Sequence, residues 1–322
     1  MATSLIFISK VHASDISPDK YYIDINTTDS LNQKLTIYAN PIATKSAHVF
    51  ITALGMRKNG EGDDREFFTP DSKNNAEPAN WISFDKTELN IAPKETAIIN
   101  WKLTPKSIVS CGTALAAIGV TENQVPDANS PDSVVGVKNT TISQLHINII
   151  KFNSEDCTNT KTNLSLLDFK VNSPLPIFNF DNVPFLTRIQ NNSKFISRKP
   201  EGFIEIFGFG DKITIPFNEK QLDIYPITTR SFDNQWIDSN YPHNGNFFEQ
   251  VIYEISHLRI GKYEARLGVT NNVTNQIKSS ASFWIIPWRI LLLILIIILL
   301  IGTIIIKGRK KPKKIKSKKN NV

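Results

Sequence analysis

The sequence contains few of the residues that build catalytic and metal-binding sites. Only 2 of its 322 residues are cysteines, and its 5 histidines are scattered without the spacing of metal ligands. No Cys-x-x-Cys pair is present, so a redox-active pair or a zinc ribbon is unsupported. Serine-hydrolase, zinc-protease and nucleotide-binding motifs are also missing. We therefore expect a protein that is not an enzyme and that uses no metal or cofactor.

Acidic residues are missing from the C-terminal end of the chain. Residues 307–322 contain nine Lys and Arg side chains and no Asp or Glu, whereas the rest of the chain has 28 basic and 30 acidic residues. The net charge of +7 therefore belongs to this tail, and it does not indicate a surface that binds nucleic acid. A basic segment after a membrane helix is attracted to anionic lipids and stays in the cytoplasm.

A long apolar run precedes the basic tail. Residues 290–306 are 17 residues without a charge, and as a helix they would reach about 25 Å, close to the thickness of a hydrocarbon core. Trp284 and Trp288 suit the aromatic belt at the membrane interface, and Arg289 can extend to the lipid headgroups there. This pattern predicts a single-pass membrane helix, whereas a buried core helix would rarely be apolar on every side. The tail places the preceding domains outside the cytoplasm.

The rest of the chain alternates apolar and polar residues with a period of two, the pattern of half-buried strands. Turn residues recur at regular spacing, which predicts an all-β fold with two immunoglobulin-like β-sandwich domains. The sequence from Leu258 to Tyr263 has the L-x-x-G-x-Y form of a tyrosine corner. The expected parts are a truncated or atypical signal segment (1–13), an N-terminal β-sandwich (14–152), a linker (153–163), a second sandwich (164–283), the membrane helix with its aromatic flank (284–306) and a cytoplasmic tail (307–322).

Three shorter segments leave alternatives open. Residues 250–260 fit either a helix or a strand, and we favour a strand because strands surround them. The segment from Gly208 to Gly210 favours a hairpin turn over a phosphate-binding loop, because no helix follows it. Cys111 and Cys157 could form a disulfide outside the cytoplasm or remain two thiols.

The polar stretch 55–80 is too long for an ordinary loop and predicts a functional or disordered segment. Four of its carboxylates form a cluster, Glu61, Asp63, Asp64 and Glu66. They lack the alternation of a calcium loop, so a solvated loop is favoured over a metal or catalytic site. Aromatic side chains next to Asn and Asp suit stacking on sugars or anchoring a protein, although each could instead fold back onto its own sandwich. The candidate ligand-binding residues are Phe67, Phe68, Trp236 and Tyr241.

The strand and turn patterns resemble the WxL-interacting-protein family of bacterial cell-surface proteins over nearly the whole chain. The matching segments are Ile16–Pro18, Leu35–Asn40, Trp81–Ile82, Leu89–Lys94, Trp101–Pro105 and Cys111–Ile118 in the first half, and Tyr225–Pro226, Arg230–Phe232, Gly261–Tyr263 and Phe283–Trp288 in the second. The resemblance implies a peptidoglycan-binding β-sandwich, a second immunoglobulin-like domain that binds a protein, and a membrane helix with a basic tail.

These patterns together predict a non-enzymatic cell-surface protein that is anchored in the lipid bilayer. Its sandwiches would contact cell-wall glycan or a surface protein. The alternative is a structural stalk or a chaperone-like assembly subunit that offers strand edges to secreted proteins.

Overall fold

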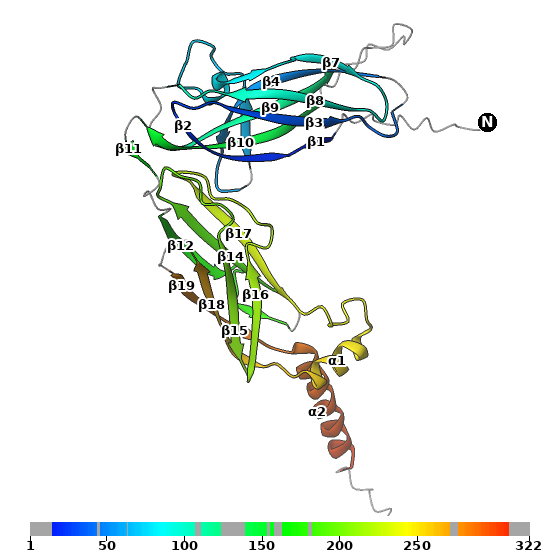
Figure 1. Ribbon diagram of the computed structural model, residues 1–322. Helices are drawn as coiled ribbons and strands as arrows, with labels where there is room; N and C mark the ends of the chain where they lie inside the picture. Colours follow the sequence, from blue (N-terminus) through cyan, green and yellow to red (C-terminus); the bar gives the residue numbers. More distant parts are fainter. Residues whose placement is uncertain are drawn as a thin grey trace, which may run out of the picture.

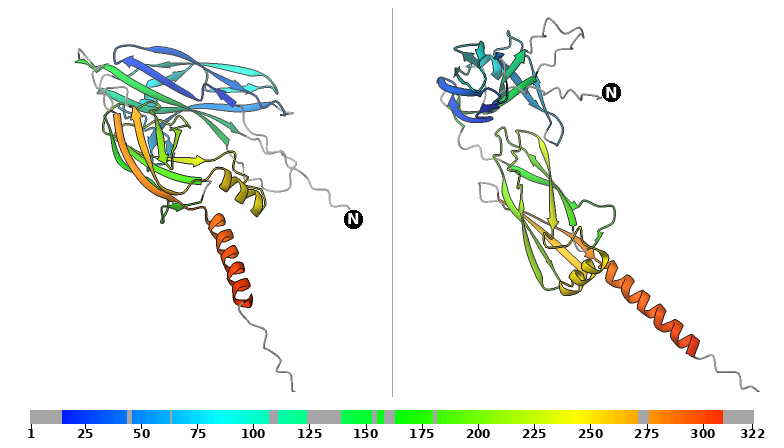
Figure 2. Two further views of the ribbon diagram at one scale, coloured as in Figure 1. Left: turned by 90° about the horizontal axis from the view of Figure 1, so that it is seen from below. Right: turned by 90° about the vertical axis from the view of Figure 1, so that its right-hand side faces the viewer.

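The computed structural model describes residues 15–43, 46–62, 64–106, 111–123, 139–152, 155–157, 163–179, 182–270 and 276–308. Two β-sandwiches are followed by one long apolar helix, which confirms the predicted all-β fold with its C-terminal helix (Figure 1). The first sandwich and this helix lie at opposite ends of the second sandwich (Figures 1 and 2). The predicted signal segment, most of the basic tail and most of the predicted linker lie outside the described residues.

The first sandwich consists of two sheets. One has the strand order β1-β3-β8-β6, and its strands are β1 (Asp15–Ser17), β3 (Leu31–Tyr38), β6 (Ile82–Phe84) and β8 (Thr96–Leu103). The other has the order β11-β10-β9-β4-β5, with β2 beside β10 and β7 beside β4. Its strands are β2 (Lys20–Asn26), β4 (Ala47–Lys58), β5 (Arg65–Phe68), β7 (Glu88–Ile91), β9 (Gly112–Asn123), β10 (Asn139–Phe152) and β11 (Glu155–Asp156).

The alternation in the sequence fixes which side chains form the first core. In β8 the residues Ile99, Trp101 and Leu103 are buried, and the residues between them face solvent. The ring of Tyr21 packs edge-on against Trp101 with ring centroids 5.1 Å apart.

The expectation of a structureless stretch over 55–80 is wrong. Strand β4 continues to Lys58 and pairs with β5, with Gly55 opposite Phe68. A short 3-10 helix, η1 (Pro78–Trp81), then leads into β6. Glycine at position 55 permits this pairing, because the ring of Phe68 lies directly over it and a Cβ atom there would be only 2.4 Å from the ring.

The second sandwich consists of a three-stranded and a five-stranded sheet. The first has the order β12-β14-β17, with β12 (Leu164–Val171), β14 (Asn182–Asn191) and β17 (Thr229–Ile237). The other has the order β13-β19-β18-β15-β16, with β13 (Ile177–Phe178), β15 (Glu201–Gly208), β16 (Asp211–Phe217), β18 (Gly261–Thr270) and β19 (Gln276–Ile285).

The predicted hairpin turn joins β15 to β16 and is confirmed. Gly208 pairs with Asp211, and the two residues between them, Phe209 and Gly210, both have a positive φ. Tyr263 lies at the start of β18, where it is fully buried with its ring 5.7 Å from that of Phe283. The hydroxyl bond that defines a tyrosine corner stays a prediction.

The expectation of a strand over 250–260 is wrong, because residues Phe247–Ser256 form helix α1. The Asn246 side chain accepts a hydrogen bond from the backbone N–H of Glu249, and the Glu249 carboxylate accepts one from that of Asn246. This capping box fixes the start of the helix. The second helix, α2 (Trp288–Gly308), contains a stretch from Trp288 to Lys307 that is long and apolar enough to cross a membrane.

Cys111 and Cys157 form a disulfide with their Cα atoms 5.8 Å apart. Gly112, the residue after Cys111, lies where the first sandwich contacts the second. Its φ is +146°, and a Cβ atom there would be only 2.9 Å from the carbonyl oxygen of Lys194. The backbone N–H of Thr113 donates to that same oxygen over 2.8 Å, so glycine permits the contact between the domains.

Candidate functional site

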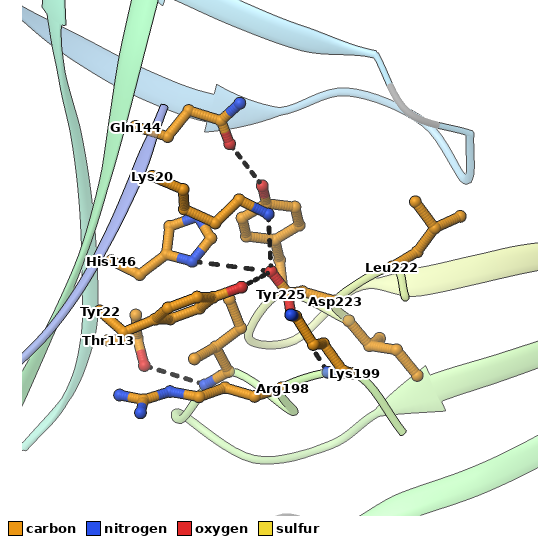
Figure 3. A network of polar contacts seen from close by, with 12 residues as sticks. Lys20, Tyr22, Thr113, Gln144, His146, Arg198, Lys199, Leu222, Asp223 and Tyr225 are labelled. Atoms are coloured by element: carbon orange, nitrogen blue, oxygen red, sulfur yellow. Dashed lines mark hydrogen bonds and ion pairs between the residues drawn. The ribbon is translucent and has the colours of Figure 1, made fainter. Parts of the chain in front are cut away.

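A buried carboxylate joins the two sandwiches. Asp223 belongs to the segment between β16 and β17, and its side chain is almost completely buried. It accepts hydrogen bonds from the Tyr22 hydroxyl (2.5 Å), from Lys20 Nζ (3.1 Å) and from the backbone N–H of Lys199 (3.1 Å) (Figure 3). Lys20 and Tyr22 come from β2 of the first sandwich. One side chain of the second sandwich is therefore bonded to two of the first.

Burial alone would raise the pKa of Asp223. The hydrogen bond from Tyr22 and the positive charge of Lys20 outweigh this effect and hold the pKa of Asp223 below its ordinary value. The carboxylate is therefore charged at neutral pH. Conversely, burial and the Asp223 charge raise the pKa of Tyr22, which keeps its hydroxyl protonated and able to donate.

His146 on β10 lies beside this carboxylate and is fully buried. Its Nδ1 atom is 3.8 Å from the carboxylate oxygen of Asp223, and its ring packs edge-on against Tyr22 and Tyr225. Burial lowers the pKa of His146 to about 3, helped by the charges of Lys20 and nearby arginines, although Asp223 acts in the opposite direction. The imidazole is therefore neutral, and the Asp223 contact is no ion pair at neutral pH.

The β4–β5 hairpin of the first sandwich makes a second polar contact. Glu61 accepts hydrogen bonds from both Nε and Nη2 of Arg188 on β14, and one from the hydroxyl of Ser231 on β17. The hydrogen bonds from Arg188 lower the pKa of Glu61 to about 2. Nearby, Arg65 Nε donates to the Tyr225 hydroxyl over 2.9 Å. The hydrogen bonds of Asp223 join the sandwiches at one place, and those of Glu61 and Arg65 join them at another. Two separate contacts therefore hold the second sandwich in one orientation relative to the first.

The carboxylates of the β4–β5 hairpin do not form a common site. Glu61 contacts the second sandwich, whereas Glu66 is paired with Arg57 on the neighbouring strand. Asp63 lies outside the described residues. Within the described part of the chain, no three His, Cys, Asp or Glu residues are placed to hold a metal ion.

The predicted ligand-binding aromatics are not gathered on one surface. Trp236 and Tyr241 are only 5% and 3% exposed, so the expectation that they stack on a ligand is wrong. Trp236 belongs to the second core, where the alternation of β17 turns its side chain inward. Phe67 and Phe68 are half-buried in β5: Phe67 packs near the domain interface, and Phe68 lies under the Arg57 guanidinium.

A groove of about 610 Å³ runs between β16 and β17, the outer strands of the two facing sheets. Its lining combines apolar and polar side chains, which include Ile215, Leu222, Phe232, Ile237, Lys220, Asp233 and Gln235. In the described residues, β17 pairs only with β14, and β16 only with β15. The chain between β16 and β17 forms no regular strand there, so both strand edges face the groove.

A second groove, of about 770 Å³, lies beside β3, β6 and β8 of the first sandwich. Its lining residues include Phe84, Asn32, Asp85 and Asn100, together with Tyr21 and Trp101, whose side chains are buried in the first core.

The start of α2 is bonded to α1. Arg289 Nη1 donates to the fully buried carboxylate of Glu254 over 2.9 Å, and the Tyr241 hydroxyl donates to the same oxygen over 3.2 Å. Arg289 therefore attaches the long helix to α1, and its contact with lipid headgroups stays a prediction. Trp284 and Trp288 remain about half exposed at this junction.

The interface residues gave little signal in the sequence. Asp223 and Tyr225 lie in a segment whose alternation predicts a strand, yet the structure has only an isolated bridge there between Ser197 and Ile224. Asp223 lies between Leu222 and Ile224, at a position where the alternation predicts a polar side chain facing solvent, so the sequence contains no sign of its burial. His146 also reads as a structural histidine within a strand, and only the fold brings it beside Asp223.

No protein-family model and no curated protein sequence matches the chain, so the resemblance to WxL-interacting proteins stays a hypothesis. Among solved structures, the CupB2 chaperone of Pseudomonas aeruginosa is similar at 9% identity over 83% of this chain and 98% of that chain, with a TM-score of 0.37. The CsuC–CsuE chaperone–tip adhesion subunit complex of Acinetobacter baumannii matches at 11% identity over 83% and 97%, with a TM-score of 0.38. A PapD-like domain of human CEP192 matches at 10% identity over 48% and 99%, with a TM-score of 0.30.

Proposed function

We propose that this chain is a membrane-anchored, non-enzymatic protein that binds an extended segment of a secreted or surface protein by strand addition to β17. The groove between β16 and β17 carries this proposal. This is the chaperone-like assembly role that the sequence predicts as its alternative. The proposal rests on the strand edge of this chain, and it takes nothing from what chaperones of similar fold bind.

The backbone of β17 supplies the hydrogen-bonding groups. In an antiparallel sheet, successive residues direct their N–H and C=O groups to opposite sides of the strand. The N–H of Ser231 points away from β14, because it donates to the carbonyl oxygen of Glu61 over 3.0 Å. By the same alternation, Asp233, Gln235 and Ile237 direct their backbone groups into the groove. A peptide in extended conformation would pair with them.

The side chains along the groove suit such a peptide. Ile215, Leu222 and Ile237 offer apolar contacts, while Lys220 and Asp233 offer charges of both signs. In strand addition, main-chain hydrogen bonds give affinity, and pockets for alternate side chains give specificity. We therefore expect a ligand that alternates apolar and polar residues.

The rest of the molecule holds this groove at a fixed place. We propose that α2 spans the bilayer with the basic tail in the cytoplasm, which puts both sandwiches and their disulfide outside. The bonds of Asp223 and Glu61 fix the first sandwich to the second, and Arg289 fixes the second to α2. The chain is then a rigid stalk as well as a binding protein.

Replacing Gln235 with proline tests the proposal, because proline removes the outward N–H while the edge of the sheet tolerates it. Nonapeptides would be selected from a random library on the full-length chain in nanodiscs. We expect the selected peptides to bind Gln235→Pro at least about tenfold more weakly than the wild type, since a lost hydrogen bond and a clash both oppose pairing.

The matched control is Gln235→Ala, which shortens the side chain and keeps the N–H; its affinity should stay close to that of the wild type. Equal binding to the proline variant, or a selection that enriches no peptide, would show that β17 is not the site.

Glycan binding by the first sandwich is a second candidate function. The groove beside β8 favours it, because the half-buried Phe84 lines it together with Asn32, Asp85 and Asn100, whose amide and carboxylate groups can bond sugar hydroxyls. Retention of the full-length chain on purified peptidoglycan should then fall when Asn100 is replaced by leucine. Retention that is unchanged by Asn100→Leu would exclude this groove.

A further inference from the structure

Helix α1 carries an apolar stripe that no other part of the described chain covers. Phe248, Ile252 and Ile255 are 68%, 67% and 55% exposed. Their spacing of four and three residues places them on one face of the helix. Large apolar side chains that line up in this way on a soluble surface indicate an interaction site.

The stripe points in a fixed direction, because other parts of α1 are tied to the protein. Val251 and Glu254, on a neighbouring face, are buried, and Glu254 is bonded to Tyr241 and Arg289. The capping box secures the first turn of the helix. The exposed side chains are therefore not a loosely packed edge of the core.

The position of α1 indicates what covers the stripe. The helix lies beside the first turn of α2 (Figures 1 and 2), and its partner Arg289 is the residue just before the apolar run. Trp288, the first residue of α2, and Trp284, four residues before it, are also about half exposed. Two more apolar residues, Leu258 and Ile260, are exposed directly after α1. The stripe therefore lies close to the start of α2, the helix that we propose crosses the membrane.

We infer that α1 lies in the outer interface of the bilayer, with Phe248, Ile252 and Ile255 inserted among the upper acyl chains. The inference rests on α2 spanning the membrane, as proposed above. An amphipathic helix with this arrangement lies in the plane of the interface. Together with α2 it holds the membrane at two places, which sets the tilt of the second sandwich and therefore of the whole stalk.

The chemistry of α1 also indicates which lipids it contacts. The helix has no Lys or Arg, and it carries Glu249 and Glu254. Insertion would therefore depend on apolar contact and would occur in uncharged phosphatidylcholine without anionic lipid.

Spin-label depth measurements on the full-length chain in phosphatidylcholine nanodiscs test this inference. Labels are attached to a ketone-bearing amino acid, so that the disulfide stays intact, at position 252 in α1, at position 298 in α2 and at position 98 on the exposed face of β8. We expect the label at 252 to lie about 5–10 Å into the headgroup and acyl boundary. The label at 298 should lie in the bilayer core, and the label at 98 in water.

A label at 252 in water with the label at 298 in the core overturns the inference and leaves the anchor intact. Both labels in water overturn the inference and the anchor together. A label at 252 that is shielded from both water and lipid, at short distance from the same label in another molecule, would show that a second copy covers the stripe.

A substitution without a label gives an independent measurement. Ile252→Ser should speed hydrogen exchange of the α1 amides in nanodiscs, because the stripe no longer holds the helix at the interface. Leu167→Ser, at an exposed apolar residue of β12, is the matched control and should leave α1 unchanged. Equal exchange of α1 in both variants would count against membrane contact.

Discussion

Replacing Asp223 with asparagine is expected to lower the free energy of unfolding by about 3–5 kcal/mol, the usual cost of removing one partner from a buried ion pair. Asp223 is the acceptor for Lys20, Tyr22 and the Lys199 backbone, and its side chain is almost inaccessible to solvent. Asparagine keeps the shape but loses the charge. Lys20 is then left partly buried without its counter-ion.

Urea unfolding of the full-length chain in nanodiscs measures this loss, and paired spin labels on the two sandwiches measure the angle between them. The distance distribution should broaden, because Asp223 is a main link between the domains. Glu201→Gln, an exposed carboxylate at the start of β15, is the matched control and should change stability by less than about 0.5 kcal/mol.

A double-mutant cycle identifies the cause of the Asp223 effect. In a Lys20→Met background, Asp223→Asn should cost less, by about 0.5–3 kcal/mol, because the unpaired cation is absent. If the two effects simply add, the ion pair is not what joins the domains.

As the pH falls from about 6.5 to 4, wild-type stability should drop by about 3 kcal/mol more than that of a His146→Phe variant, at about 1.4 kcal/mol per pH unit. The folded-state pKa of His146 is lowered to about 3 from an ordinary value of 6.5. Between these values the unfolded chain binds a proton that the folded chain does not. Stability therefore falls as the pH falls.

The effects of His146 and Asp223 on stability occur in different pH ranges. A carboxylate whose pKa is lowered stabilises the fold above its unfolded pKa, which is near 3.8, and that stability is lost only below it. Phenylalanine suits the site, since the imidazole is neutral and packs between Tyr22 and Tyr225.

Urea unfolding at several pH values gives the change in unfolding free energy per pH unit for the wild type and for His146→Phe. A His48→Phe variant is the control, because His48 lies on β4 away from the interface. It shows how far replacing a histidine elsewhere changes the dependence of stability on pH. Equal slopes for the wild type and His146→Phe would mean that the folded protein accepts a proton at His146, with Asp223 as its partner.

Patterns that depend on neighbours in the sequence were predictable. The period-two alternation that buries Ile99, Trp101 and Leu103 gives the strands of the first core, and the apolar run of α2 stands out by composition alone. The helix α1 was also within reach, because Asn246 and Glu249 have the spacing of a capping box. The prediction did not use this capping box, and it wrongly favoured a strand over 250–260 because strands surround that segment.

Partners far apart in the chain were not predictable. The hydrogen bond between Tyr22 and Asp223 spans 201 residues, and the ion pair between Glu61 and Arg188 spans 127. The alternation within a strand predicts which face is buried, but it does not predict which residues of another domain the strand contacts. For the same reason, Trp236 was predicted to be a surface residue, although the register of β17 directs it into the core.

The sequence alone determined the β-sandwich class, the apolar helix and the basic tail, because period, composition and charge are properties of short segments. Only the tertiary structure decided that Asp223 and His146 join the domains, that β16 and β17 leave a groove, and that α1 turns three apolar side chains outward beside α2. Each of these depends on contacts between distant segments, which form only when the sheets pack and exclude water from the groups between them.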